Sequence, residues 1–270
     1  MIDIKKEGKV SVLMGIYNCE QTLPQAIKAI QRQTYKNWEL IICDDGSSDD
    51  SYHVAQQFAN NDTRIILLKN KSNLGLNKTL NLCLSHATGE FIARMDGDDD
   101  CSEERFEKQI CFLKSQNDYQ IVSSQMSFFD EKGVWGYTKK TEIPTKEDVV
   151  SGSPICHAPV MMYKKCMDAV GGYTEDIRMI RVEDVNLWIK LYTAGFRCYN
   201  LPEALYYMRN DKNAFSRRKY KYRINSTYVR LLGCKALRLA PQYYVKAFSP
   251  MIVGLVPNFV RRIIKKYLIS

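Results

Sequence analysis

The sequence lacks several patterns that would assign it to common protein classes. Its nine cysteines are scattered singly, and no pair has the C-x-x-C spacing of a zinc or redox site. We therefore expect reduced thiols rather than a disulfide framework. The opening MIDIKKEGKVSVLMG has no long apolar segment followed by a small-residue cleavage site, so we expect no signal peptide. No internal repeat or low-complexity segment is visible.

Acidic residues are nearly absent from the C-terminal end of the chain. From Arg209 onward there are 15 lysines and arginines and a single acid, Asp211, whereas the rest carries 24 basic and 29 acidic residues. The apolar run at 250–260 is too short to span a bilayer. The following VRRIIKKYLI alternates cationic and apolar pairs, which is typical of an interfacial helix. We predict a main domain over 1–208 and a basic, amphipathic, membrane-associating extension over 209–270.

The first hundred residues alternate between predicted strands and helices. Strands are expected at 10–18, 38–43, 65–70 and 91–95, with one amphipathic helix between each pair. This order favours a parallel sheet covered by helices on both faces. In such sheets ligands gather at the carboxyl ends of the strands. Gly15, the Asp44–Asp45–Gly46 turn and the Asp96 cluster all fall at such ends.

The stretch FIARMDGDDD places four aspartates in five positions directly after a predicted strand. Carboxylates this close repel one another unless a cation or hydrogen bonds compensate them. Asp96 and Asp98 have the spacing to share one ion, and Mg²⁺ typically takes one or two carboxylates plus substrate phosphates. The EF-hand pattern does not fit, because the required glycine and terminal glutamate are missing. A solvated loop that caps the helix beginning near SEERFEKQI is the competing interpretation.

Two other acidic motifs each allow two interpretations. The turn CDDGSSDD suits a type I turn whose Ser47, Ser48 and Asp49 cap the next helix, but one aspartate also suits a nucleotide base or ribose. Glu183 and Asp184 open a predicted helix, RVEDVNLWIKLYTAG, where acids complement the helix dipole. A carboxylate at that position inside a cleft also suits a general base.

Taken in order, VSVLMGIYN, QTYKNWELIICDDGSSDD, NLGLNKTLNLCLSHATGEFIARMDGDDD, GGY and VEDVNLW resemble the inverting family 2 glycosyltransferases of the bacterial surface-polysaccharide type. The resemblance covers about residues 10–200. It implies an α/β fold of the GT-A (Rossmann-like) type, with a mixed, mainly parallel sheet flanked by helices and a basic C-terminal helical extension.

The resemblance also implies where the donor binds. Gly15, Tyr17 and Asp45 would hold the uracil end of a UDP-sugar, and Lys78 would approach its diphosphate. The D-x-D motif, Asp96 and Asp98, would bind Mn²⁺ or Mg²⁺ on the diphosphate, with Asp98 the more direct ligand.

The catalytic and acceptor side is implied by the later motifs. Asp184 would be the catalytic base, with Glu183 beside it. His157 and Trp188 would line the acceptor side, although a satisfied buried histidine is an equally good interpretation of His157. Many relatives carry a late histidine as a further metal ligand, and YYMRNDKNAFSRR has none.

These features predict a cytoplasmic enzyme on the inner face of the cell membrane. It would move a sugar from UDP to a glycan acceptor carried on a polyprenyl diphosphate, with the basic tail on anionic lipid. A nucleotidyltransferase is one alternative, but the sequence lacks a Gly- and Arg-rich phosphate loop near its start. A nucleic-acid binder is the other, since FSRRKYKYR (215–223) interleaves aromatics with cations. Because that alternative leaves the acidic cluster without a purpose, no nucleic acid is expected as a partner.

Overall fold

The computed structural model describes residues 8–209 and 220–255 of the 270-residue chain. Its first part alternates strands and helices, as the sequence predicts. The elements are β1 (Val10–Ile16), α1 (Leu23–Gln31), β2 (Trp38–Asp44), α2 (Ser51–Asn61), β3 (Ile65–Lys69), α3 (Leu76–His86) and β4 (Phe91–Arg94). Strand β1 pairs in parallel with both β2 and β4, and β2 pairs in parallel with β3. The predicted parallel arrangement of this part is confirmed.

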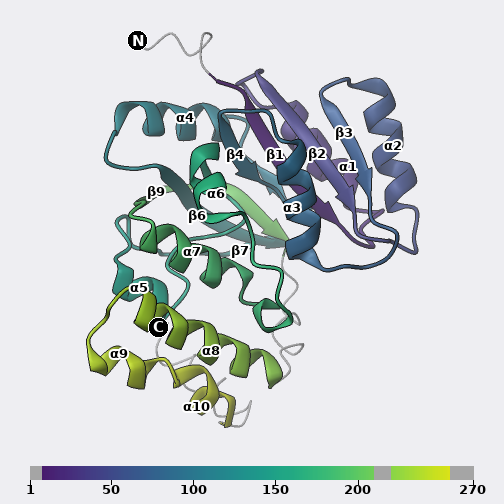
Figure 1. The fold of residues 1–270 in the computed structure, drawn as a ribbon. Coiled ribbons are helices and arrows are strands. Elements are labelled where there is room, and N and C mark those ends of the chain that lie inside the picture. The colour runs from purple at the N-terminus through teal and green to yellow at the C-terminus, as the bar shows by residue number, and fades with distance from the viewer. Residues whose placement is uncertain (1–7, 210–219, 256–270) are drawn as a thin grey trace.

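The second part completes the sheet with strands of unequal length, some of which pair antiparallel. It comprises β5 (Asp100–Cys101), α4 (Arg105–Ser115), β6 (Ile121–Asp130), β7 (Gly133–Tyr137), α5 (Lys146–Ser151), β8 (Met161–Tyr163), α6 (Lys164–Val170), the 3-10 helix η2 (Ile177–Met179), α7 (Glu183–Thr193) and β9 (Cys198–Arg209). The strand order is β3-β2-β1-β4-β8-β6-β9-β5, with β7 paired to β6 (Figure 1). The sheet is therefore mixed, as expected.

Apolar side chains of β1 point alternately to two cores, one on each face of the sheet. Val12 and Met14 pack with α1 and α4, whereas Leu13 packs with α3, α7 and α8. This two-sided burial explains why the early strands are continuous hydrophobic runs. It leaves the strand ends as the places where polar side chains can gather.

Three helices follow β9 within the described residues: α8 (Lys221–Ala236), α9 (Pro241–Lys246) and α10 (Ser249–Leu255). They lie below α5 and α7 in Figure 1. Val229 and Cys234 of α8 are fully buried in the same core as α7. A β-carbon at Gly233 would lie 2.6 Å from Ile189 and 2.7 Å from Val150, so the glycine permits this close packing. None of the helices in the described part of the chain is long and apolar enough to cross a membrane.

One local expectation needs partial correction. Asp49 Oδ1 accepts a hydrogen bond from Ser51 N–H at the first residue of helix α2 (3.1 Å), but Ser47 and Ser48 do not cap the helix. Instead, Asn18 N–H donates to Ser47 Oγ (3.0 Å) and Ser48 N–H donates to Asn18 Oδ1 (2.9 Å), which ties this turn to the end of β1. Further along the chain, β8 is short because the residues that precede it form a loop. The amphipathic segment at 260–269 and most of 215–223 lie outside the described residues.

Candidate functional site

The polar strand ends meet at one edge of the sheet, as the parallel pairing requires. In the register of β1 and β2, Ile16 lies opposite Asp44, and the chain leaving β4 reaches Asp96 two residues after its last paired strand residue. A pocket of about 440 Å³ opens there. Its lining residues are Gly15, Ile16, Tyr17, Asn18, Cys19, Glu20, Gln21, Thr22, Asp49, Asp96, Gly97, Asp98 and Arg209.

Asp96 is held by a buried arginine from its own strand. Arg94 Nη1 and Nη2 donate to the two Asp96 carboxylate oxygens at 3.1 and 2.5 Å, and only 7% of the Arg94 side chain is exposed. Burial by itself lowers the pKa of Arg94. The neighbouring acidic groups, Asp96 first and Glu183 among them, have the larger combined effect and raise this pKa above its usual value. The charges of both the D-x-D motif and the first turn of α7 therefore act on the same guanidinium.

Asp98 has the opposite environment from Asp96. No side chain of the described residues donates a hydrogen bond to its carboxylate, which faces the pocket. Burial, and then the neighbouring Asp96 carboxylate, raise the pKa of Asp98 to about 6. Its negative charge therefore lacks a direct side-chain partner among residues 8–209 and 220–255, which is the condition in which a carboxylate gains most from a bound cation.

The donor set is too small for a metal centre built from protein alone. Among residues 8–209 and 220–255, no group of three or more His, Cys, Asp or Glu side chains comes together as a metal site. Asp98, with Asp96 beside it, fits the type of Mg²⁺ or Mn²⁺ site that takes its remaining oxygens from substrate phosphates and water. The residues present fit such an ion only together with a phosphorylated ligand.

The third aspartate of the cluster faces inward. Asp99 is 2% exposed, and its carboxylate accepts hydrogen bonds from the Tyr206 hydroxyl (2.8 Å) and the Arg209 N–H (2.7 Å). Burial, followed by the Asp96 and Asp98 charges, raises the pKa of Asp99 well above its usual range. The Tyr206 hydroxyl also accepts from the Asp96 N–H (3.1 Å). Strand β9 thus holds the acidic turn in place from more than a hundred residues away.

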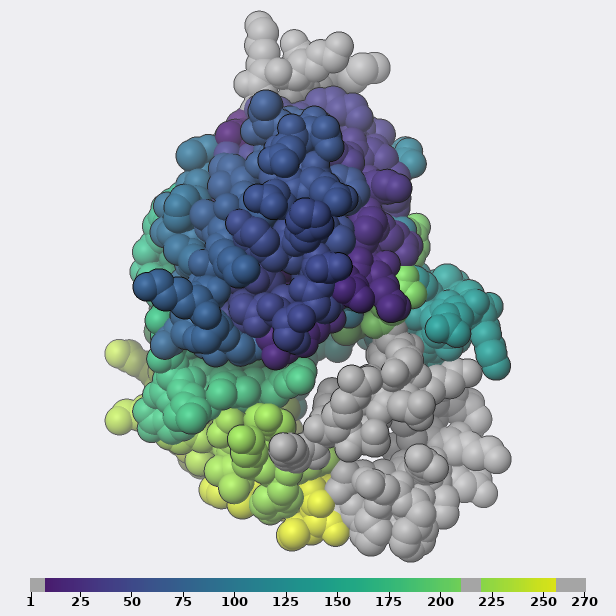
Figure 2. All heavy atoms as spheres, turned by 90° about the vertical axis from the view of Figure 1, so that its right-hand side faces the viewer, coloured from purple at the N-terminus to yellow at the C-terminus, as the bar shows by residue number. Residues whose placement is uncertain are grey.

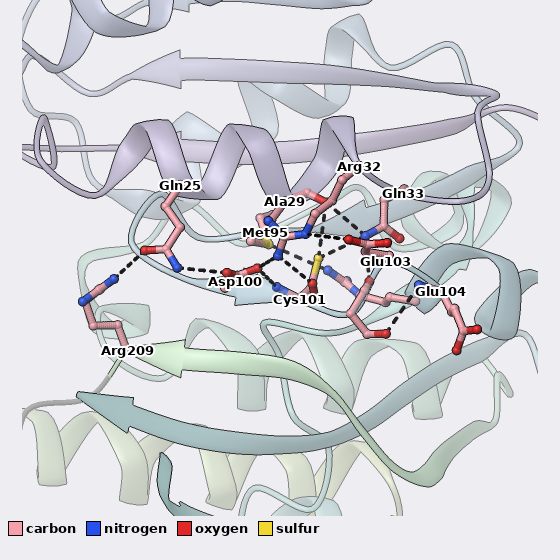
Figure 3. Close-up of polar contacts among 12 residues, drawn as sticks. Gln25, Ala29, Arg32, Gln33, Met95, Asp100, Cys101, Glu103, Glu104 and Arg209 are labelled. Atoms are coloured by element: carbon pink, nitrogen blue, oxygen red, sulfur yellow. Dashed lines mark hydrogen bonds and ion pairs between the residues drawn. The ribbon is translucent and has the colours of Figure 1, made fainter. Parts of the chain in front are cut away.

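The fourth aspartate stabilises the turn from the other side (Figure 3). Asp100 forms an ion pair with Arg32 of α1 and accepts a hydrogen bond from Gln25 Nε2 (2.9 Å). Gln25 Oε1 in turn accepts from Arg209 Nη2 (2.7 Å). Neither Asp99 nor Asp100 caps α4, whose N-cap residue is Glu104. The competing interpretation, a solvated loop that caps this helix, is therefore wrong for these two acids, because both carboxylates are engaged in tertiary contacts.

The aspartate of the D-D-G-S turn positions a loop. Asp45 Oδ1 accepts from Asn70 Nδ2 and Leu74 N–H, both at 2.8 Å, and Oδ2 accepts from Gly75 N–H at 2.9 Å. Gly46 has φ +72°, and a β-carbon there would lie 2.6 Å from the backbone carbon of Ser72. Only glycine allows the 72–75 loop to lie this close.

The acids of α7 lie in its first turn, as predicted. Asp184 Oδ2 accepts a hydrogen bond from Ser153 Oγ (3.2 Å), and Oδ1 accepts from Val185 N–H (2.8 Å). Burial and the adjacent Asp184 carboxylate raise the pKa of Glu183. The two carboxylates are thus half-buried, and Asp184 is oriented by Ser153 from the loop after α5.

His157 is a satisfied, partly buried histidine. Its Nε2 lies 2.9 Å from the Tyr173 hydroxyl, and its ring packs edge-on against Trp188 at 5.7 Å between centroids. Burial, and then the Arg94 charge, hold the pKa of His157 well below its usual range, so it is neutral at pH 7. Trp188 is fully buried, so it cannot contact an acceptor directly and instead packs behind His157.

Tyr17 and Lys78 differ in how they relate to the pocket. Tyr17 lines it and is 50% exposed. Lys78 is exposed on α3 and is not among the lining residues. A β-carbon at Gly15 would come within 3.2 Å of Leu76 and Thr79, so α3 packs closely against this strand end.

Sequence reasoning missed Arg94, Tyr206 and Arg209. One feature of the sequence could have indicated Arg94, because a charged residue inside an otherwise apolar predicted strand requires a buried partner. No feature of the sequence indicates a role for Tyr206 or Arg209, because only the pairing of β9 beside β5 and β6 brings them to the acidic turn.

Comparisons with known proteins agree with this architecture. Residues 11–171 match the family model described as glycosyl transferase family 2. The chain is 44% identical over 253 residues to "Putative glycosyltransferase EpsE" of Bacillus subtilis, covering 93% of this chain and 91% of that protein. It is 27% identical over 228 residues to the Escherichia coli UDP-Glc:alpha-D-GlcNAc-diphosphoundecaprenol beta-1,3-glucosyltransferase WfaP, covering 84% and 88%.

One solved structure shows the same fold at low identity. S. aureus TarS 1–349, crystallised with UDP-GlcNAc, superposes with a TM-score of 0.71 at 18% identity, covering 90% of this chain and 71% of that one. The mixed α/β fold of the GT-A type is thereby confirmed.

Proposed function

The chain belongs to glycosyltransferase family 2, and from this membership we propose that it transfers a sugar from a UDP-sugar to a lipid-linked glycan acceptor in surface-polysaccharide synthesis. The observation that carries the proposal is the position of Arg94. Its buried guanidinium bonds Asp96 at the donor pocket and lies near Glu183 at the start of α7. This supports the proposal that the donor pocket and the candidate base belong to one site.

The pocket suits the diphosphate end of the donor. Asp98 presents a carboxylate to which no side chain of the described residues donates, and Arg209, which also lines the pocket, is fixed by its Nε bond to Asp98 O (3.0 Å). A bound Mg²⁺ or Mn²⁺ would neutralise charge on the departing diphosphate. Gly15, Tyr17 and the Asp45 turn line or adjoin the part of the edge where the uridine would lie.

The first turn of α7 suits base catalysis. Ser153 and the Val185 N–H orient the Asp184 carboxylate, which would take the proton from an acceptor hydroxyl as that oxygen attacks the anomeric carbon. Attack from the face opposite the diphosphate inverts the anomeric configuration. Glu183 lies beside it in the same turn and would support the site.

The acceptor class and location are proposed from two sources. WfaP, by its name, acts on a diphosphoundecaprenol-linked sugar. The charge distribution of this chain places its cations at the C-terminal end, which favours the inner face of an anionic membrane. Family membership argues against the nucleotidyltransferase and nucleic-acid-binding alternatives.

The experiment is a panel of UDP-sugars tested for metal-dependent thermal stabilisation and UDP release. Asp98→Asn should lose the metal-dependent shift in Tm. Asp184→Asn should keep that shift but transfer sugar about 10²–10⁴-fold more slowly. Asp168→Asn, which removes an exposed acid paired with Lys164, is the matched control and should change neither. The proposal fails if no UDP-sugar raises the Tm of the wild-type protein with Mn²⁺ or Mg²⁺ present.

A further inference from the structure

Exposed apolar side chains gather beside the helix that carries the candidate base. Ile177 of η2 is 80% exposed, the highest value for a large apolar side chain in the described part of the chain. Ile180, three residues before Glu183, is 44% exposed, and Ile224 of α8 is 49% exposed. Single exposed apolar residues are ordinary, but a contiguous group marks an interaction surface.

These side chains are held in their exposed positions by tertiary contacts. Arg178 Nη1 donates to the Tyr228 hydroxyl of α8 (2.7 Å), and its guanidinium lies 4.7 Å from the centre of that ring. Asn225 Nδ2 donates to the Ile180 carbonyl (3.2 Å). The η2 segment is therefore fixed onto α8, with its isoleucines directed away from the core.

Helix α10 extends the same surface. Arg223 of α8 donates to the Pro250 carbonyl (3.2 Å), and a β-carbon at Gly254 would lie 2.8 Å from the Tyr220 ring, so α10 packs against the start of α8. Exposed apolar side chains lie on both sides of this contact between α8 and α10. We call the whole group the apolar end, made of Ile177, Ile180, Tyr220, Ile224, Ile252 and Leu255.

Cations accompany the apolar end. Arg181 and Lys221 are exposed and form no ion pair within the described ranges, whereas Arg178 is paired with Asp176. Arg181 also has φ 66°, a left-handed conformation that is strained for a non-glycine residue. That strained residue makes the turn from η2 into α7, so it holds the isoleucines directly before the candidate base.

We propose that the apolar end contacts an anionic lipid bilayer and thereby presents the first turn of α7 to a membrane-borne acceptor. Exposed isoleucines enter the interface while neighbouring cations meet lipid phosphates. This surface lies in η2, α8 and α10, apart from the 260–269 segment. Figure 2 shows the start of α8 and the end of α10, in green and yellow, beneath the N-terminal strands and helices on one side of the molecule. The inference rests on the proposed function, because it needs an acceptor at the membrane.

The test compares two double variants of the full chain. Ile177→Ser with Ile180→Ser removes apolar area from the proposed surface. Val134→Ser with Val245→Ser is the matched control, since these residues are 52% and 74% exposed on β7 and α9. Both pairs are solvent-exposed, so each variant should fold, which the thermal shift with metal and UDP-sugar verifies independently of any membrane.

The readout is co-sedimentation with vesicles of equal parts POPC and POPG. The Ile177/Ile180 variant should partition about tenfold more weakly than wild type, and the control should be unchanged. Arg181→Gln should weaken binding to the POPG-containing vesicles but not to pure POPC vesicles.

Three results would overturn the inference. The first is equal vesicle binding by wild type and the Ile177/Ile180 variant. The second is an equal loss of binding in the Val134/Val245 control. The third is a wild-type dimer, seen by light scattering, that the Ile177/Ile180 variant converts to a monomer, because a second copy would then cover the surface. In each case metal-dependent donor binding would persist, so failure of this inference can be distinguished from failure of the proposed function.

Discussion

Replacing Arg94 by methionine should destabilise the fold far more than removing a comparable surface arginine. The change keeps most of the side-chain length but leaves Asp96 without its two hydrogen bonds. Removing one partner of a buried ion pair costs about 3–5 kcal/mol. Because 27% of the Asp96 side chain is exposed, water compensates part of the loss, and we expect about 3 kcal/mol.

The assay is urea unfolding followed by circular dichroism, with the free energy of unfolding taken from the midpoint and slope. Arg64→Met is the control, since its ion pair with Asp62 involves a 39% exposed arginine and should contribute less than about 1 kcal/mol. Adding Asp96→Asn to Arg94→Met should recover part of the loss, because the uncompensated charge is then removed.

The same substitution has a functional consequence that a purely structural role would not produce. Without Arg94, Asp96 carries an unpaired charge beside Asp98, so the pocket should bind Mn²⁺ more tightly in the absence of nucleotide while UDP-sugar turnover falls. Equal unfolding free energies for Arg94→Met and Arg64→Met would refute the stability argument. Unchanged Mn²⁺ affinity in the Arg94→Met variant would refute the electrostatic argument.

Further predictions concern a titrating group, a backbone contact and the thiols. The folded-state pKa of His157 lies below the value of about 6.5 in an unfolded chain. The contribution of His157 to the free energy of unfolding is therefore complete above pH 6.5 and is lost as the pH falls, by up to about 1.4 kcal/mol per pH unit. His157→Gln should therefore flatten the fall in unfolding free energy between pH 6.5 and 5, and an unchanged difference from wild type across that range would contradict this. Gly46→Ala should cost about 3 kcal/mol through its left-handed φ and the clash with Ser72, whereas Gly171→Ala, at φ +65° with nothing within 4 Å, should cost only about 1 kcal/mol; equal midpoints in urea would disprove the contact argument. All nine cysteines are free and Cys111 alone is exposed, so a thiol reagent should label one site quickly in the native protein and nine in denaturant. Rapid labelling of several native thiols would count against the packing described.

Local sequence patterns determined the order of elements and the chemistry placed at strand ends. Hydrophobic runs and turn residues were enough to locate the strands and helices of the first hundred residues, because each of these signals acts over a few positions. Parallel pairing then followed, and with it the expectation that Gly15, Asp45 and Asp96 share one edge. The ordered motifs were sufficient to identify the family.

The tertiary structure decided how each acid in those motifs is used. Of the four aspartates at 96–100, Asp96 is paired with Arg94, Asp99 is buried against Tyr206 and Asp100 is bound by Arg32. Asp98 faces the pocket, and no side chain in the described part of the chain donates a hydrogen bond to its carboxylate. Local spacing treats all four alike. Their differences come from side chains on other strands and helices, and a carboxylate's environment depends on what lies within a few ångströms in space rather than on its neighbours along the chain.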